Sequence, residues 1–184
     1  MKQLFTIIFC SLIAIGAQAK EVKGLNFPEE LKVGTTTLKL NGIGIRTAMS
    51  ILSVYVGGLY VATPSTDPKV IVEATTPKRI DMRFLMSVGM DKLKEAWNEG
   101  FFKNADKGYV YREDLNKFFG LLRGMKSKDR IQLTFLADKL EVQINEEPVQ
   151  TVAGADFTKT MLKLYIMNLS DTGLKNGLLG LKKN

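Results

Sequence analysis

The sequence predicts a single α+β domain, an antiparallel sheet with helices packed mainly on one of its faces. Three observations predict this fold class. Runs with strand-like alternation stand near residues 36–62, 78–86 and 130–144. Two segments with helical spacing lie between the second and third of these runs, and no linker or repeat divides the chain. At 184 residues and 45% hydrophobic composition the chain can build one real core, which excludes intrinsic disorder.

The first predicted strands form a hairpin. Leu38 and Leu40 share one face of a strand at 36–46, whereas Ile43 and Ile45 continue on odd positions, so we expect a bulge at Gly42. Residues 52–62 are rich in Val, Tyr and Leu with almost no polar break, as expected for a central strand covered on both faces. We therefore expect these two strands to pair.

A short helix and a third strand follow. The Ser-Thr-Asp-Pro run at 65–68 predicts a helix N-terminus, with the helix ending near Ala74. Residues 78–86 alternate cleanly, which predicts a half-buried strand. One face would carry Ile80, Met82, Phe84 and Met86, and the other Arg79, Asp81 and Arg83.

The second half of the chain predicts two helices, a hairpin and two further helices. Apolar residues recur at helical spacing over 90–104 and 111–123. Residues 130–136 and 140–144 alternate across a polar turn and predict a β-hairpin. Asp156 is expected to cap a helix through residue 167, and Ser170 or Asp171 to start a last short one.

Residues 1–19 have the three-part pattern of a secretory signal peptide. Lys2 supplies the positive start, an apolar run extends from Leu4 to Ile15, and Ala17-Gln18-Ala19 supplies small residues before the cut. The run is too short to span a bilayer, which takes roughly 20 residues. We expect cleavage after Ala19, a single domain over 20–184 and a periplasmic or secreted protein.

Composition excludes several kinds of site. The chain has no His, which excludes Ser-His-Asp and Cys-His catalysis and His-ligated metal centres. Its one Cys, Cys10, lies in the predicted signal peptide, and no acidic cluster has the spacing of a calcium loop. We therefore expect no metal and no cofactor.

The net charge of +7 does not predict nucleic-acid binding. Lys and Arg are spread along the chain, usually beside an acidic residue, and no stretch carries five basic residues together. This distribution is typical of a solvated surface. It leaves peripheral contact with an anionic membrane surface open, and the sequence does not determine the oligomeric state.

The segment Asn-Gly-Ile-Gly-Ile-Arg at 41–46 carries the most informative chemistry. After the expected bulge, Gly42, Gly44 and Arg46 point to one face, and the two glycines would leave open space beside the guanidinium. In a hairpin with the next strand, Tyr55 falls opposite Gly44 on the same face. Arg and Tyr would together donate hydrogen bonds to a carboxylate. The alternative is that the glycines mark only a bulge and Arg46 meets solvent or an internal acid.

The methionines leave a second question open. Several methionines could line an adaptable pocket or serve as ordinary core filler. They are Met82, Met86, Met90, Met161 and Met167.

The run from Leu40 to Val61 resembles the first hairpin of the chalcone isomerase fold. It reads Leu-Asn-Gly-Ile-Gly-Ile-Arg and then Val-Tyr-Val-Gly-Gly-Leu-Tyr-Val. The later order of elements also fits, including Phe-x-x-x-Met-Leu-x-x-Tyr-Ile at 157–166. Over residues 36–180 the chain is similar to exported bacterial chalcone isomerase-like proteins. The resemblance implies a chalcone isomerase-like open-faced antiparallel sheet.

The resemblance also implies roles for individual residues. It places Arg46 in the ligand cleft, facing an anionic or carbonyl group. Tyr55 stands where the plant enzymes have a Thr and where plastid fatty-acid-binding relatives have a Tyr that joins the Arg in holding a fatty-acid carboxylate. The Lys and Tyr that true isomerases need fall between Phe84 and Ser87 and near Leu93, where only Ser87 is polar. The catalytic set therefore looks incomplete.

The sequence thus favours a non-catalytic exported binding protein for a fatty acid or similar amphipathic carboxylate. The expected ligand-binding residues are Arg46, Tyr55, Gly42 and Gly44. An isomerase or intramolecular lyase acting on a small, chalcone-like carbonyl substrate, with Arg46 as electrophile and Tyr55 as proton donor, is the alternative. A third hypothesis is an interaction protein whose cleft is vestigial.

Overall fold

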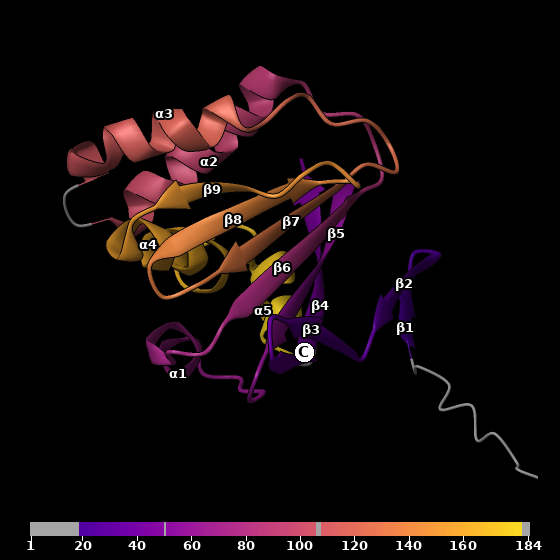
Figure 1. The fold of residues 1–184 in the computed structure, drawn as a ribbon. Coiled ribbons are helices and arrows are strands. Elements are labelled where there is room, and N and C mark those ends of the chain that lie inside the picture. The colour runs from indigo at the N-terminus through magenta and orange to yellow at the C-terminus, as the bar shows by residue number, and fades with distance from the viewer. Residues whose placement is uncertain (1–18, 50, 106–107, 182–184) are drawn as a thin grey trace, which may run out of the picture.

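The structure, a computed structural model, describes residues 19–49, 51–105 and 108–181. It consists of a curled antiparallel sheet with helices packed on one side, as the sequence predicts (Figure 1). The predicted signal peptide lies outside the described residues except for Ala19. In the described part, no helix is long and apolar enough to cross a membrane.

The main sheet has seven strands whose order in space is their order in the chain, each pairing with the next. These strands are β3 (Glu30–Val33), β4 (Thr36–Ala48), β5 (Leu52–Val61), β6 (Lys78–Phe84), β7 (Arg130–Phe135), β8 (Lys139–Ile144) and β9 (Gln150–Ala153). A separate hairpin of β1 (Ala19–Val22) and β2 (Leu25–Pro28) precedes them. The sequence did not predict β1, β2, β3 and β9, which have only four residues each.

The helices connect strands or follow the last one. They are α1 (Pro68–Glu73), α2 (Met90–Asn104), α3 (Arg112–Gly120), α4 (Ala155–Ile166) and α5 (Thr172–Leu178), with a 3-10 turn, η1, at Gly108–Tyr111. Asp67 and Asp171 cap α1 and α5 through side-chain oxygens, as expected. The prediction that Asp156 caps α4 is wrong: Gly154 stands at the cap with a φ of 132°, and Asp156 lies inside the first turn.

The predicted bulge in β4 is confirmed. The register against β5 shifts between Leu40 and Gly42, and shifts again between Arg46 and Thr47. Because each shift turns the following side chains to the opposite face, the stretch 42–46 places its even-numbered residues toward the helices.

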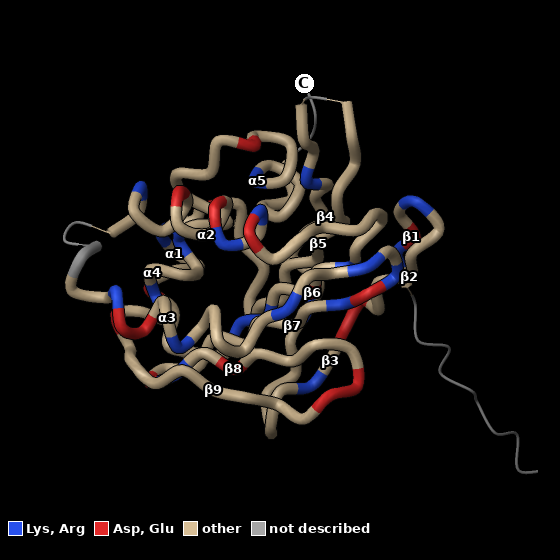
Figure 2. Tube along the Cα trace, turned by 90° about the horizontal axis from the view of Figure 1, so that it is seen from above, with Lys and Arg blue, Asp and Glu red and all other residues tan. Residues whose placement is uncertain are grey.

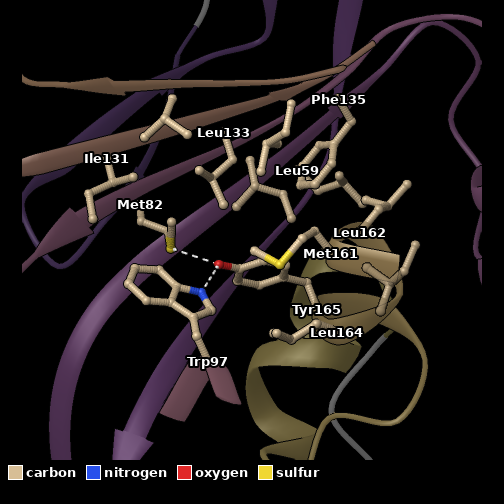
Figure 3. Close-up of a cluster of buried hydrophobic side chains, with 14 of the residues drawn as sticks. Leu59, Met82, Trp97, Ile131, Leu133, Phe135, Met161, Leu162, Leu164 and Tyr165 are labelled. Atoms are coloured by element: carbon tan, nitrogen blue, oxygen red, sulfur yellow. Dashed lines mark hydrogen bonds between the residues drawn. The ribbon is translucent and has the colours of Figure 1, made fainter. Parts of the chain in front are cut away.

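The core lies between the sheet and the helices. Ile80, Met82 and Phe84 face it from β6 and are almost fully buried, as the alternation predicts. In its centre the Trp97 indole donates a hydrogen bond to the Tyr165 hydroxyl, with Nε1 and Oη 2.7 Å apart, and that hydroxyl points to the Met82 sulfur (Figure 3). This contact ties α2, α4 and β6 together.

Part of the opposite face of the sheet is also covered, which the alternation in β6 did not predict. Asp81 is fully buried there and accepts hydrogen bonds from Arg83 and Arg130. Phe27 of the β1–β2 hairpin lies on this face, with the Arg83 guanidinium carbon 4.4 Å from its ring centroid. The second face of β6 is therefore fully buried at Asp81, under a segment outside the main sheet, whereas Arg79 and Arg83 on that face stay partly exposed.

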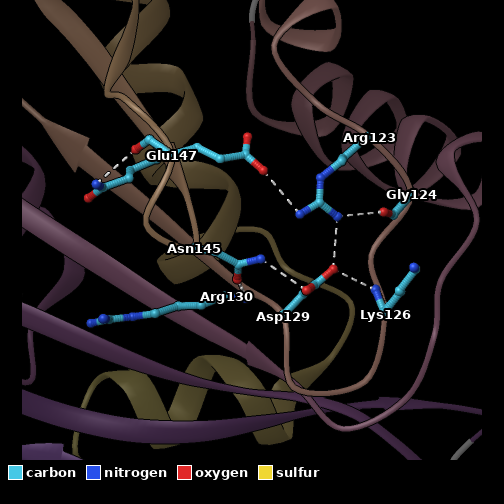
Figure 4. A network of polar contacts seen from close by, with 8 residues as sticks. Arg123, Gly124, Lys126, Asp129, Arg130, Asn145 and Glu147 are labelled. Atoms are coloured by element: carbon cyan, nitrogen blue, oxygen red, sulfur yellow. Dashed lines mark hydrogen bonds and ion pairs between the residues drawn. The ribbon is translucent and has the colours of Figure 1, made fainter.

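A polar network joins the loops at one end of β7 and β8 (Figure 4). Asp129 accepts hydrogen bonds from the Lys126 backbone, from Asn145 and from Arg123, and Arg123 also pairs with Glu147. These hydrogen bonds lower the pKa of Asp129 to about 2, and the bond from the Lys126 backbone has the largest effect. Elsewhere charged residues of both signs are interspersed over the sheet and helices (Figure 2).

Candidate ligand-binding site

Arg46 and Tyr55 are direct cross-strand partners. The predicted pairing of Tyr55 with Gly44 is wrong, because Gly44 pairs with Gly57. The difference arises at the turn, where the second register shift changes which residues of β4 and β5 meet. The prediction that Arg46 and Tyr55 share a face is confirmed, since directly paired residues of antiparallel strands point to the same side. That side faces the helices.

The guanidinium of Arg46 is only partly engaged. Its Nη1 donates to the Asp171 carboxylate at 3.0 Å and to the Thr47 carbonyl at 3.2 Å. Within the described residues, Nε and Nη2 make no hydrogen bond, and a third of the side chain is exposed. Two donors of the planar fork are therefore available to a further acceptor.

Asp171 is the internal acid that the sequence left open as an alternative for Arg46. One oxygen of its largely buried carboxylate accepts from Leu174 N at 2.9 Å, and the other accepts from Thr47 N at 2.7 Å and from Arg46. Burial raises the pKa of Asp171, but these hydrogen bonds outweigh it and hold the pKa below its ordinary value. The sequence identified Asp171 only as a helix start, since its partner lies 125 residues away.

Tyr55 places a protonated hydroxyl beside this ion pair. Burial raises the pKa of Tyr55 well above its ordinary value, while Arg46 lowers it and Asp171 raises it further. The ring lies 5.4 Å from that of Phe84, its partner on β6. Among the described residues the hydroxyl has no hydrogen-bond partner, so it is available as a donor.

The expected open space beside Gly42 and Gly44 is filled, and that expectation is wrong. A Cβ on Gly42 would stand 2.2 Å from the Gly177 carbonyl oxygen, and one on Gly44 would stand 2.2 Å from that of Leu174. The two glycines thus let α5 approach the backbone of β4 directly. A direct role for them in ligand binding stays a prediction.

The space beneath Tyr55 is filled by side chains. Phe84 and Leu93, where the resemblance places residues of the isomerase catalytic set, are buried apolar side chains of the core. Met82 and Met161 are core filler, whereas Met86 is exposed. The structure therefore shows Tyr55 packed against a filled core and Arg46 partly exposed beside it.

A groove of about 710 Å³ runs beside this arrangement. Ile45 and Thr47 of β4, Ser53 of β5 and Asn176 of α5 line part of it, and it borders Gly44. Neither Arg46 nor Tyr55 lines it. Over 19–49, 51–105 and 108–181, no three acidic or Cys side chains gather as they would around a metal ion.

The arrangement can bind an anion whose two oxygen atoms lie in one plane, as those of a carboxylate do. Two free guanidinium nitrogens and a neutral phenol hydroxyl, set among apolar side chains, suit a carboxylate attached to an apolar body. For proton transfer, the described site offers only a phenol whose pKa burial raises.

Comparisons with known proteins agree with the fold. The family model described as chalcone isomerase-like matches residues 19–180. The structure is similar to that of a fatty-acid binding protein from Arabidopsis thaliana, with a TM-score of 0.70 and 19% identity over 88% of this chain and 96% of that one. No curated protein matches the sequence.

Proposed function

Because this chain belongs to the chalcone isomerase-like family, we propose that it is an exported, non-catalytic binding protein for a fatty acid or a similar amphipathic carboxylate. One observation carries the proposal. Arg46 holds two unengaged guanidinium nitrogens beside the protonated hydroxyl of its strand partner Tyr55, on the helix-facing side of the sheet. The similarity to a fatty-acid binding protein supports a binding role.

Energetics favour a ligand with both a carboxylate and an acyl chain. An unpaired buried carboxylate costs several kcal/mol, so the head group needs Arg46 and Tyr55. Each buried methylene contributes about 0.8 kcal/mol, so ten would contribute roughly 8 kcal/mol before ordering costs. The ligand carboxylate would take the free side of the guanidinium while Asp171 keeps the other.

Binding of a long chain requires α5 to move. Leu174 of this seven-residue helix is buried next to Gly57, beside Tyr55. The acyl chain would displace Leu174 and lie against Phe84 and the neighbouring core. The helix is held by its backbone contact with Gly42 and Gly44, by the buried Leu174 and Leu178, by Asp171, and by the Asn41 side chain, which donates to the Leu178 carbonyl at 2.9 Å. We propose α5 as the entrance.

Export is the second part of the proposal. The positive start, apolar run and small residues of segment 1–19 support cleavage after Ala19 and a periplasmic or secreted location. An exported chain with this fold would carry its ligand outside the cytoplasm.

The alternative of an isomerase is weaker. It would use Arg46 to polarise a carbonyl and Tyr55 to donate a proton. The buried Phe84 and Leu93, standing where the resemblance places catalytic polar groups, favour binding over catalysis.

One native mass-spectrometry experiment tests ligand and export together. The protein is purified without detergent from its native source and then offered lauric acid or 1-dodecanol. We expect the mass of a chain that begins at Lys20, an acyl ligand released in the gas phase, and preference for the acid over the alcohol. Arg46→Met should weaken laurate binding roughly tenfold or more, and Tyr55→Phe several-fold.

The matched control is Arg112→Met, which removes an exposed arginine at the start of α3 and should leave binding unchanged. If Arg46→Met does not fold, Tyr55→Phe decides. A wild-type protein that carries no acyl ligand and accepts none would refute the binding proposal. A chain that retains residues 1–19 would refute export, and chalcone turnover lost in Tyr55→Phe would favour the isomerase.

A further inference from the structure

A second cavity lies at the opposite end of β6 from Phe84, the partner of Tyr55. It has a volume of about 190 Å³ and lies between the end of α1, the start of β6, the β7–β8 turn and the first turns of α4. Val72, Phe135, Leu136 and Leu162 form its apolar part, and Glu73, Asp156 and Lys159 also line it. None of the residues in the Arg46 arrangement lines it.

A buried lysine also lines this cavity. Lys78, the first residue of β6, is only 7% exposed, and its ammonium donates to the Ala74 carbonyl at the end of α1. An ammonium has three donors, and a buried one is stabilised by a carboxylate partner. Among the described residues Lys78 has no acid within ion-pair distance, so its charge is not compensated.

The acidic residues near the cavity do not supply the missing charge. Glu73 is bound by Lys159, with Oε2 and Nζ 2.6 Å apart. Asp156 is exposed at the rim. Burial lowers the pKa of Lys78, and the nearby Lys159 lowers it further, against a smaller opposing effect of Glu73. The uncompensated charge is thus unfavourable without a further partner.

Two more features of α4 favour an anion in this cavity. Thr158 lines it, is 2% exposed, and its hydroxyl has no hydrogen-bond partner among the described residues. The first N–H groups of α4, at Ala155 and Asp156, have no acceptor inside the helix and carry the positive end of its dipole. The cavity therefore combines an ammonium, a hydroxyl and a helix N-terminus with apolar walls.

We propose that this cavity is a binding site for a small monocarboxylate with a short apolar tail. Its carboxylate binds the Lys78 ammonium, the Thr158 hydroxyl and the start of α4, and its tail packs on Val72 and Leu162. The site is separate from the one at Arg46, and it does not depend on the proposed fatty-acid function. A volume of about 190 Å³ suits a short tail better than a long acyl chain.

An NMR titration of the ¹⁵N-labelled chain with sodium butyrate tests the proposal. We expect saturable shifts of the backbone amides of Thr75, Ala155 and Thr158. Neither 1-butanol nor sodium chloride at equal concentration should reproduce them, because the alcohol lacks the charge and chloride lacks the tail. Lys78→Met should weaken butyrate binding roughly tenfold or more, as expected for loss of a charge-assisted hydrogen bond.

Two variants serve as controls. Lys69→Met removes an exposed charge on α1 outside the cavity and should bind butyrate like the wild type. Arg46→Met should do the same, which separates this site from the proposed fatty-acid site. If Lys78→Met does not fold, Thr158→Val, which keeps the size of the side chain, should weaken binding several-fold. Unchanged binding in Lys78→Met or Thr158→Val, shifts caused equally by 1-butanol, or no saturable shift at all would overturn the proposal.

Discussion

The Asp171 carboxylate makes three contacts that hold the candidate site together. It caps α5, accepts the Thr47 amide of β4 and pairs with Arg46. All three contacts favour the ionised form, and the pKa of Asp171 lies below its ordinary value as a result. The same residue therefore positions the guanidinium and holds α5 on the sheet.

We predict that Asp171→Asn lowers the free energy of unfolding by about 1–3 kcal/mol at neutral pH, because the amide removes charge-assisted hydrogen bonds. Since the folded state lowers the pKa, the ionised carboxylate stabilises the fold above the ordinary Asp value near 3.8. This contribution is lost as the pH falls through the lower folded value. Urea unfolding across pH should show the difference between wild type and variant shrinking in acid.

The control for this prediction is Asp67→Asn. Asp67 caps α1 from an exposed position, and Asn is as good a cap as Asp, so we expect a change below about 0.5 kcal/mol. Equal losses in the two variants would show that the ion pair with Arg46 contributes nothing.

Helix α5 packs against β4 at the distance of backbone contact. Glycines on both sides make this possible, because a Cβ on Gly177 would stand 2.4 Å from the Gly44 Cα. A helix and a strand that meet through glycines leave no room between them. This contact closes the space where the sequence predicted an opening.

We predict that Gly44→Ala destabilises the protein by about 1–3 kcal/mol or more, because the new methyl group meets the Leu174 backbone rather than a flexible side chain. Thermal unfolding measures the loss. Hydrogen exchange of the α5 amides should rise more than that of the α2 amides, since α5 is the element displaced.

Gly120→Ala is the matched substitution, because among the described residues nothing beyond its chain neighbours and the backbone of its own helix lies within 4 Å of the place its new methyl group would take, and its φ is not positive. We expect it to leave stability unchanged or raise it by about 0.4–1 kcal/mol. If both variants unfold alike, Gly44 is not needed for the close contact of α5 with β4.

The whole molecule protects the two faces of its sheet differently. Helices cover one face (Figure 1), and Phe27 of the β1–β2 hairpin covers part of the other. Phe27 lies over Gly58, where a Cβ would be 2.7 Å from the ring, and beside Arg83, which donates to the Asn26 carbonyl at 2.6 Å. The hairpin thus shields the buried Asp81 cluster from water.

We predict that Phe27→Ala lowers the free energy of unfolding by about 3–5 kcal/mol, the usual cost of emptying a buried aromatic site. Urea unfolding of the full chain gives the value. Phe102→Ala, at a side chain that is 46% exposed, should cost much less. Similar losses would mean that the hairpin does not close the second face in solution.

Most helices and strands could be predicted from the sequence because the pattern that marks each one lies within its own residues. The alternation in 78–84, the helical spacing in 90–104 and the turn residues before 68 depend only on neighbours in sequence. The sequence did not predict strands β1, β2, β3 and β9, because four residues show too little alternation. Gly24 and Gly34, with positive φ, nevertheless mark two of their turns.

The sequence by itself determined the fold class, the bulge at Gly42 and the shared face of Arg46 and Tyr55, since strand periodicity governs the last two and strand and helix periodicity together govern the first. Only the tertiary structure decided that Asp171 pairs with Arg46, that α5 fills the space beside Gly44, and that Lys78 is buried without an acid among the described residues. These contacts join residues far apart in the chain. They depend on how the helices and strands, once formed, pack against one another, and periodicity within a segment carries no information about that packing.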